Sequence, residues 1–130
     1  MDEFSVSFPG GKKVEIHYQD WNVMTDQAVE DGGDGVAPSP YDLFMGSLTA
    51  CAGIVALSFC RKRELPTEGL KVRLQPDYSE EEHRTVKVTI TVELPEGFPE
   101  KYKGALSKAV DTCAVKRALA NPPEFETVIL

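Results

Sequence analysis

Residues Ser39–Lys62 read SPYDLFMGSLTACAGIVALSFCRK, a run with the start signal and the length of a buried helix. Ser39 is suited to cap the helix and Pro40 to occupy its first turn, and Asp42 completes a capping-box-like pattern. No further charge occurs before Arg61. We therefore predict a helix that is apolar nearly all round and lies at the centre of the fold, where another helix or a partner subunit covers it.

Two predicted hairpins flank this helix. Before it, Phe4–Phe8 and Lys13–Tyr18 alternate apolar and polar residues around a Pro-Gly-Gly turn. After it, Leu70–Leu74 and Val86–Leu94 alternate in the same way around an acidic turn. Since alternation places the apolar side chains on one face of each strand, one face of each hairpin must be covered.

The C-terminal part is predicted to add a second helix and a final strand. Pro99 opens the helix, and an apolar stripe then follows at helical spacing: Tyr102, Leu106, Val110 and Cys113. Phe125–Leu130 resembles a strand, whereas the acidic, glycine-rich stretch 25–38 is expected to form a mobile loop. The order of elements predicts an α+β fold in a single domain, residues 1–130.

Composition excludes several classes of function. The net charge of −7, with 14 Lys and Arg, gives no basic stripe for a phosphate backbone, so we expect no nucleic-acid partner. The N-terminus lacks a signal-peptide pattern, and no apolar run is expected to span a bilayer. We therefore expect a cytoplasmic protein with no membrane partner, whose three cysteines are reduced at rest.

The cysteines carry the most chemical information. Cys51 and Cys113 are 62 residues apart, and each lies in an apolar stretch with helical character. They form either a redox pair held in a buried pocket or two inert core thiols. Cys60 lies on the opposite side of the helix from Cys51 and is interpreted as packing. With two histidines and no CxxC or HExxH spacing, we expect no metal site and no cofactor.

Two motifs resemble those of a known family. Ser39–Cys51 and, some sixty residues later, Thr112–Leu119 are similar to the two cysteine motifs of the OsmC/Ohr family, the osmotically inducible and organic hydroperoxide resistance proteins. The resemblance implies an OsmC-like fold, with antiparallel sheets wrapped around a long buried central helix in an intertwined homodimer. It also implies a peroxidase that reduces organic hydroperoxides, with active sites at the subunit interface and a dithiol reductant such as a lipoylated protein.

The same resemblance assigns roles to the two thiols. Cys51 would attack the peroxide to give a sulfenic acid, and Cys113 would resolve it to a disulfide. Cys51 lies 12 residues beyond Ser39, too deep in its own helix for the dipole to lower its pKa, so a cation is expected to do so. In the family's peroxidases that cation is an N-terminal arginine held by a glutamate.

This chain departs from that pattern. It has no arginine before Arg61, and the glutamate position holds Tyr41, with the acid displaced to Asp42. The candidate supporting residues are Tyr41, Asp42, Lys13, Lys116 and Arg117. For Asp42 a capping role is favoured, and for Lys116 and Arg117 a solvated helix face is the alternative.

Three hypotheses follow. The first is a thiol peroxidase acting in oxidative stress defence through Cys51 and Cys113. The alternative is a protein of the same fold without peroxidase activity, which binds a small apolar ligand at the dimer interface. The third is a structural dimer module with inert thiols.

Overall fold

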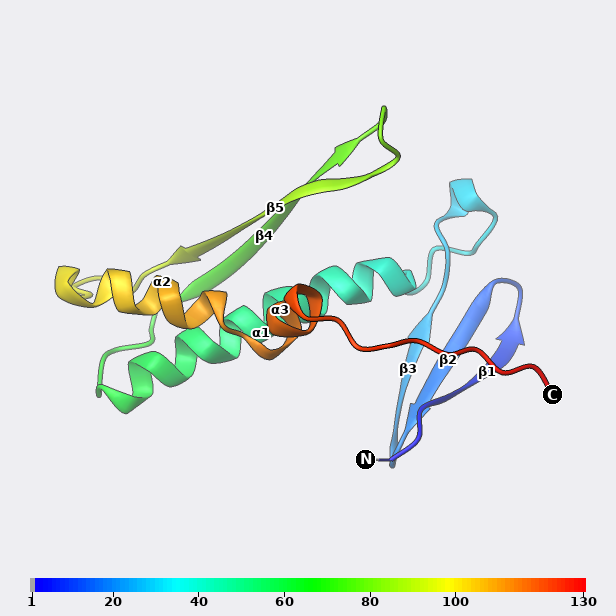
Figure 1. Ribbon diagram of the computed structural model, residues 1–130, viewed down its shortest axis with the longest axis horizontal. Helices are drawn as coiled ribbons and strands as arrows, with labels where there is room; N and C mark the ends of the chain where they lie inside the picture. The colour runs from blue at the N-terminus through cyan, green and yellow to red at the C-terminus, as the bar shows by residue number, and fades with distance from the viewer. Residues whose placement is uncertain (1) are drawn as a thin grey trace. The chain divides into compact units, whose positions relative to one another are not determined.

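The computed structural model describes residues 2–130, and its contacts group the chain into two compact units, Met1–Gly46 and Ser47–Leu130 (Figure 1). The α+β class, with antiparallel sheets and a long helix, is confirmed. The boundary between the units falls inside the long helix α1 (Pro40–Lys62), which the two units share. The expectation of a single domain over residues 1–130 stays a prediction.

The first unit contains a three-stranded antiparallel sheet in the order β1 (Ser5–Gly10), β2 (Lys13–Tyr18) and β3 (Trp21–Thr25). The predicted hairpin corresponds to β1 and β2. The third strand was missed, since its five residues follow β2 after a turn of only two residues and did not stand out as a separate run.

The acidic segment after β3 is organised around one carboxylate instead of lacking structure as expected. Asp26 is fully buried and accepts hydrogen bonds from the backbone N–H groups of Gln27, Asp34 and Val36. These hydrogen bonds lower the pKa of Asp26, the one from Gln27 most. A Cβ on Gly33 would lie 2.1 Å from the Gln27 carbonyl oxygen, so this turn requires glycine.

Helix α1 begins as predicted. The Ser39 hydroxyl accepts a hydrogen bond from the Asp42 N–H at 3.1 Å, and the Asp42 carboxylate accepts one from the Ser39 N–H at 3.0 Å. This reciprocal pair is a capping box. Contrary to the sequence expectation, α1 is long and apolar enough to cross a bilayer by length and composition. It is nevertheless a core helix, since it supplies five of the buried residues.

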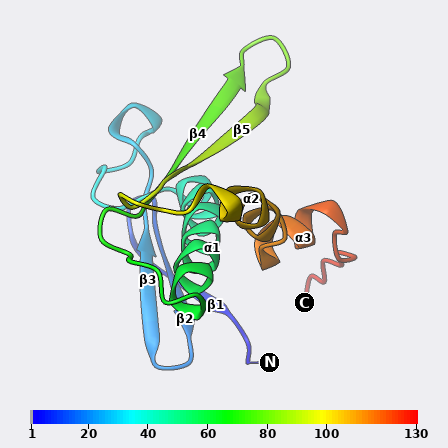
Figure 2. The same cartoon turned by 90° about the vertical axis from the view of Figure 1, so that its left-hand side faces the viewer.

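The second unit has its core between two helices and a hairpin. The hairpin consists of β4 (Lys71–Ser79) and β5 (Arg84–Glu93), and the second helix is α2 (Lys103–Asp111), preceded by a 3-10 turn, Glu100–Tyr102. In α1 the buried residues recur at helical spacing: Leu48, Ala52, Ala56, Phe59 and Cys60. Of these, Ala52, Ala56 and Phe59 form one buried cluster with Leu106 and Val110 of α2, and apolar residues of the hairpin pack against that cluster. Figure 2 shows the backbones of these elements, α1, α2, β4 and β5.

The predicted second helix is broken at Cys113. Its first part, α2, ends at Asp111, and α3 (Ala114–Ala120) begins after Cys113, which has the extended backbone of φ −59° and ψ 151°. The prediction that Cys113 lies on a helical stripe is therefore wrong, although its side chain is buried as expected, with 2% exposed. The Thr112 hydroxyl donates to the Ala109 carbonyl at 2.8 Å, which closes the last turn of α2.

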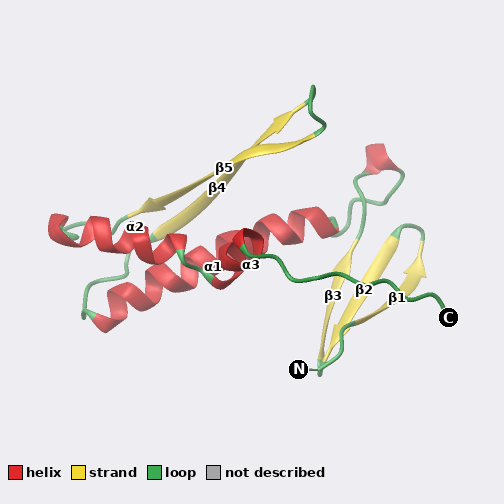
Figure 3. Cartoon of the chain, in the orientation of Figure 1, coloured by secondary structure: helices red, strands yellow, loops and turns green. Residues whose placement is uncertain are grey.

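The predicted final strand is absent from the described residues. Residues 121–130 form an extended loop without strand pairing (Figure 3). Their apolar side chains remain exposed, as in Phe125 and Ile129 at 87% each. A sequence with strand character therefore has no partner strand among residues 2–130.

Candidate active site

Cys51 lies in the middle of α1, one position before the fully buried Ala52. Its own side chain is only partly buried. A rigid helix and a buried neighbour fix the direction of the thiol, while the partial exposure leaves it reachable from solvent. This combination is typical of a reactive cysteine rather than of a structural one.

Cys113 meets Cys51 from the junction between α2 and α3. Its backbone carbonyl accepts the first hydrogen bond of α3, from the Arg117 N–H at 3.0 Å, so Cys113 is the residue that caps this helix. Its thiol lies close enough to Cys51 to lower the pKa of the Cys51 thiol. The two cysteines that the sequence analysis paired are thus neighbours within the second unit.

The start of α3 changes the acidity of Cys51. The backbone N–H of Val115 donates a hydrogen bond to the Cys51 sulfur and is the main reason why the pKa of Cys51 is lowered. Burial opposes this effect, whereas hydrogen bonds from the Cys113 thiol and the Ala114 N–H reinforce it. The first N–H groups of a helix have no partner within the helix, so they are available to an anion.

One cation adds to these hydrogen bonds. The positive charge of Arg117, in the last turn of α3, also lowers the pKa of Cys51, and it is the smallest of the contributions. Arg117 is exposed, so solvent screens its charge. Lys116 instead pairs with the Asp111 carboxylate at 2.8 Å. A cation therefore does lower the pKa of Cys51, as expected, but backbone hydrogen bonds lower it more.

A surface hollow lies on α3, the helix whose first N–H groups interact with Cys51. A hollow of about 520 Å³ on α3 is lined by Ala114 and Arg117 together with three other residues near the helix C-terminus. Neither Cys51 nor Cys113 lines this hollow, so the access of solvent to Cys51 rests on the partial exposure of its own side chain. A stabilised thiolate, an adjacent thiol and access from solvent together suit two-electron thiol oxidation followed by disulfide formation.

The other candidate residues belong to the first unit, where each has a local partner. Lys13 forms an ion pair with Asp34 in the loop after β3, and this contact raises the pKa of Lys13. Asp42 caps α1, as favoured from the sequence. The Tyr41 ring lies 5.7 Å from that of Phe44 and is half exposed.

Cys60 differs from the other two thiols. It is fully buried, and burial raises its pKa, with a smaller opposing effect from the Arg63 charge. The Arg63 guanidinium lies 3.5 Å from the Phe59 ring centroid and donates to the Phe59 carbonyl, so it closes the end of α1 over the core. These contacts agree with the packing role inferred for Cys60.

Sequence reasoning missed the backbone donors. Val115 and Ala114 act through their N–H groups, which any residue except proline would supply, so their side chains carry no signal. The break before Ala114 also lacks the usual glycine or proline. Among residues 2–130, no group of three or more His, Cys, Asp or Glu side chains is placed to hold a metal ion.

Solved structures share this fold, among them the following three. A protein from Psychrobacter arcticus 273-4, described as an osmotic stress induced and detoxification response protein, aligns with a TM-score of 0.77 at 22% identity. The alignment covers 91% of this chain and 88% of that one. An organic hydroperoxide resistance protein OsmC from Legionella pneumophila aligns with a TM-score of 0.61 at 17% identity, over 92% and 88% of the two chains.

The third structure is described as an organic hydroperoxide resistance protein from Vibrio cholerae O1 biovar eltor, with captopril bound in one of its active sites. It aligns with a TM-score of 0.58 at 17% identity, over 92% of this chain and 85% of that one. The sequence has no match among the curated proteins. The family model described as OsmC-like protein matches residues 32–128, and the chain therefore belongs to the OsmC-like protein family.

Proposed function

We propose that this protein is a thiol peroxidase that reduces organic hydroperoxides, with Cys51 as the attacking thiol and Cys113 as the resolving thiol. The observation that carries the proposal is that Cys113 and the first residues of α3 lie beside Cys51 and lower the pKa of its thiol. Two similar structures are described as organic hydroperoxide resistance proteins, which supports the choice of substrate.

The first step is the attack of the Cys51 thiolate on one oxygen of the peroxide O–O bond. The bond breaks, the peroxide accepts two electrons, and the second oxygen leaves with a proton as an alcohol. Cys51 becomes a sulfenic acid. The N–H groups of Val115 and Ala114 favour the thiolate that this step consumes, while Arg117 offers a positive charge to the developing alkoxide.

In the second step, Cys113 attacks the Cys51 sulfur as its thiolate. A disulfide forms and the sulfenic oxygen leaves as water, after taking up the proton that Cys113 lost. An external dithiol, such as a lipoylated protein, then reduces the disulfide by two thiol exchanges.

We further propose that the protein acts as a homodimer in the cytoplasm. Only 28% of the most apolar window of α1 is buried within the chain, and Ile54 on that helix is 56% exposed. Apolar surface of this extent is typical of a subunit interface. The three cysteines are free, which suits a reducing compartment.

Intact mass and thiol counting after one equivalent of cumene hydroperoxide test the peroxidase. The wild type should lose two thiols and about two mass units, while Cys113→Ser should retain a sulfenic acid that a dimedone probe captures. Cys51→Ser should keep its remaining thiols. Survival of all three thiols in the wild type would contradict the proposal and favour the alternative, a protein of this fold that binds a small apolar ligand at its dimer interface.

A further inference from the structure

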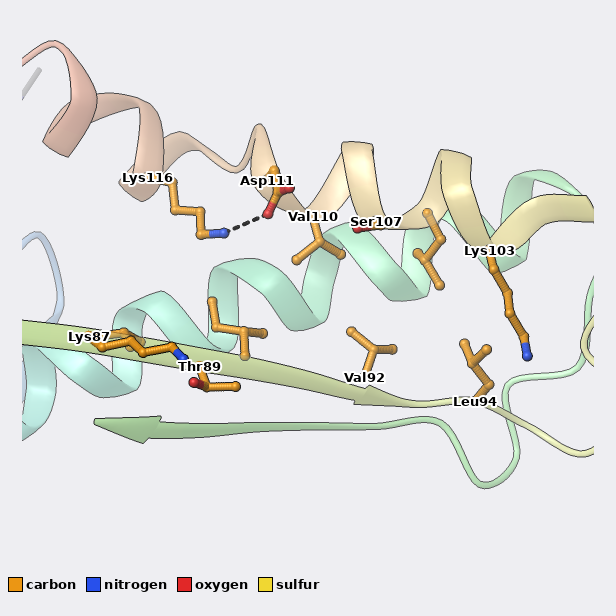
Figure 4. A pocket seen from close by; sticks show the side chains of 12 residues that line it. Lys87, Thr89, Val92, Leu94, Lys103, Ser107, Val110, Asp111 and Lys116 are labelled. Carbon is orange, nitrogen blue, oxygen red and sulfur yellow. Dashed lines mark hydrogen bonds and ion pairs between the residues drawn. The ribbon is translucent and has the colours of Figure 1, made fainter. Parts of the chain in front are cut away.

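Polar side chains in the two units differ in what they bring together. Along the groove between β5 and α2, Lys116 pairs with Asp111 at 2.8 Å (Figure 4), and Lys87 lies opposite Asp77 in the register of the hairpin. These are lysines beside carboxylates, which neutralise each other's charge. In the first unit, by contrast, a polar cluster on the sheet joins a hydroxyl to an imidazole ring.

The sheet of the first unit places a serine, a histidine and an asparagine on one face. Ser7 lies on β1, His17 on β2 and Asn22 on β3, and these strands are neighbours in that order. Asn22 is paired directly with His17. Ser5 is the residue of β1 that is paired with His17, and Ser7 lies two positions further along. Paired residues and residues two apart share a face of a sheet, so the three side chains meet.

Hydrogen bonds connect these side chains in a line. His17 Nδ1 lies 2.7 Å from Asn22 Oδ1, and since a carbonyl oxygen only accepts, Nδ1 carries the proton. The other ring nitrogen, Nε2, therefore accepts a hydrogen bond from the Ser7 hydroxyl, at 2.8 Å. Glu15 Oε1 lies 3.6 Å from Nε2, where its charge stabilises the ring once the ring takes up a proton. A hydroxyl, a base and an orienting carbonyl in this order activate a serine as a nucleophile.

The opposite face of the sheet holds the cluster in place. Three aromatic rings pack together there, those of Phe4, Tyr18 and Trp21. Tyr18 follows His17 in the chain and Trp21 precedes Asn22, so the packed rings fix the backbone that carries the polar side chains. Ser7 is exposed, and 34% of the His17 side chain is exposed, so a molecule from solvent reaches the hydroxyl.

Strand β1 supplies a backbone donor beside the hydroxyl. It is an edge strand, since only β2 pairs with it in this sheet, and every second N–H along it therefore points away from β2. The register shifts directly after Ser7, between Ser7 and Gly10, and irregularities of this kind re-aim side chains at functional sites. An N–H without a ladder partner next to a nucleophile stabilises the negative oxygen that forms when a carbonyl is attacked.

We propose that Ser7, His17 and Asn22 form a second reactive site, which cleaves uncharged, activated carboxylic esters by acyl transfer to Ser7. Ser7 Oγ attacks the carbonyl carbon while His17 Nε2 takes the hydroxyl proton. The bond from this carbon to the alcohol oxygen breaks, and the alcohol leaves with that proton, so the acyl group stays on Ser7 as an ester. Water then attacks this ester with His17 as base, which releases the acid and restores the hydroxyl.

The surroundings of Ser7 determine the class of ester. The hydroxyl lies on an exposed face, so the site does not enclose the leaving group, and the ester must carry a leaving group that is good by itself, such as a phenolate. The Glu15 charge beside the ring disfavours anionic esters. Aryl acetates meet both conditions.

Labelling by a fluorophosphonate probe tests the site on the full-length protein. A serine nucleophile displaces fluoride from the probe and keeps the phosphonyl group, which peptide mass spectrometry locates. We expect Ser7 to be labelled at least about tenfold faster than Ser5. Ser5 is the internal control, because it lies on the same exposed face of the same strand, whereas the His17 ring is bonded to Ser7.

Variants separate the base from the residue that positions it. His17→Gln should slow labelling of Ser7 about a hundredfold, since it removes the base. Asn22→Leu should slow it about tenfold, because Nδ1 loses the acceptor that orients the ring. Asn22→Asp keeps an acceptor and should stay within about threefold of the wild type, a rescue that a general loss of structure would not give. His83→Gln, in the turn after β4, is the control and should leave labelling unchanged.

Release of p-nitrophenolate from p-nitrophenyl acetate measures the ester reaction. In the Cys51→Ser background, where that thiolate does not compete, Ser7→Ala should lower the release at least about tenfold. Unchanged release in Ser7→Ala, equal labelling of Ser5 and Ser7, or unchanged labelling of His17→Gln with a normal circular dichroism spectrum would overturn the proposal. Because the site contains no thiol, these outcomes are independent of whether Cys51 reacts with peroxides.

Discussion

Cys51 and Cys60 are the same residue type on the same helix, nine positions apart, yet their surroundings change their acidity in opposite directions. Cys51 faces the first N–H groups of α3, which lower its pKa. Cys60 lies among apolar side chains, and burial raises its pKa. Reactivity in this helix is thus set by what packs against each thiol rather than by the helix that carries both.

The largest expected effect is on peroxide reduction by single-thiol variants. Cys51→Ser should lower the rate of cumene hydroperoxide consumption by at least about a thousandfold, since it removes the nucleophile. Cys60→Ala should stay within about twofold of the wild type and lose about 1 kcal/mol of unfolding free energy to the smaller core side chain. A comparable loss of turnover in folded Cys60→Ala would remove the distinction between the two thiols.

A proline substitution tests whether the backbone N–H groups at the start of α3, rather than side chains, lower the pKa of Cys51. Ala114→Pro removes one N–H that reaches Cys51, and proline is tolerated there because Ala114 is the first residue of α3 and Cys113 before it is already extended. We expect alkylation of Cys51 by iodoacetamide near pH 7 to slow about tenfold. The matched control is Ala114→Ser, which keeps the N–H.

Equal alkylation rates in Ala114→Pro and Ala114→Ser would show that the start of α3 does not stabilise the thiolate. Circular dichroism and the unfolding midpoint verify that both variants fold. Cys60 should stay unreactive in both, because no N–H of α3 is involved in its environment.

A smaller effect is expected from the exposed arginine. Arg117→Gln should slow alkylation of Cys51 about two- to threefold at low ionic strength, and added salt should shrink this difference because an exposed charge is screened. Lys116→Gln is the control, since that lysine pairs with Asp111. A larger effect of Lys116→Gln than of Arg117→Gln would show that Lys116, and not Arg117, is the cation that lowers the pKa of Cys51.

The smallest effect is on stability as a function of pH. Because the pKa of Cys51 is lowered in the folded protein, its thiolate adds to the free energy of unfolding above the pKa of an unfolded thiol, about 8.5. This added stability is lost as pH falls through the pKa that Cys51 has in the folded protein. Cys60, with a raised pKa, contributes below about pH 8.5 and loses that contribution as pH rises through its folded value. Urea unfolding of Cys51→Ser and Cys60→Ala across this range should show pH dependences that differ from the wild type in opposite senses.

The sequence predicted those helices and strands that short-range patterns of neighbouring residues determine. The capping box at Ser39 and Asp42 and the alternation in both hairpins predicted α1 and four strands correctly. It failed where tertiary contacts decide the outcome. Nothing in residues 111–114 marks the helix break, and residues 125–130 have strand character but no partner strand in the described part of the chain.

The same limit applies to the site. The types and spacing of Cys51 and Cys113 pointed to a thiol pair, and the family motifs supported it. The source of activation was expected to be a cation, yet the main contribution comes from the Val115 N–H. A backbone donor has no side-chain signature, so only the folded chain shows which sulfur it reaches.

The most direct test is site-resolved alkylation of the native wild-type protein from about pH 5 to pH 9, with each cysteine followed by peptide mass spectrometry. We predict that Cys51 reacts with a midpoint below the ordinary thiol value of about 8.5, while Cys60 stays unmodified across the range. Cys51 and Cys60 reacting together with an ordinary midpoint, or Cys60 reacting first, would contradict the account.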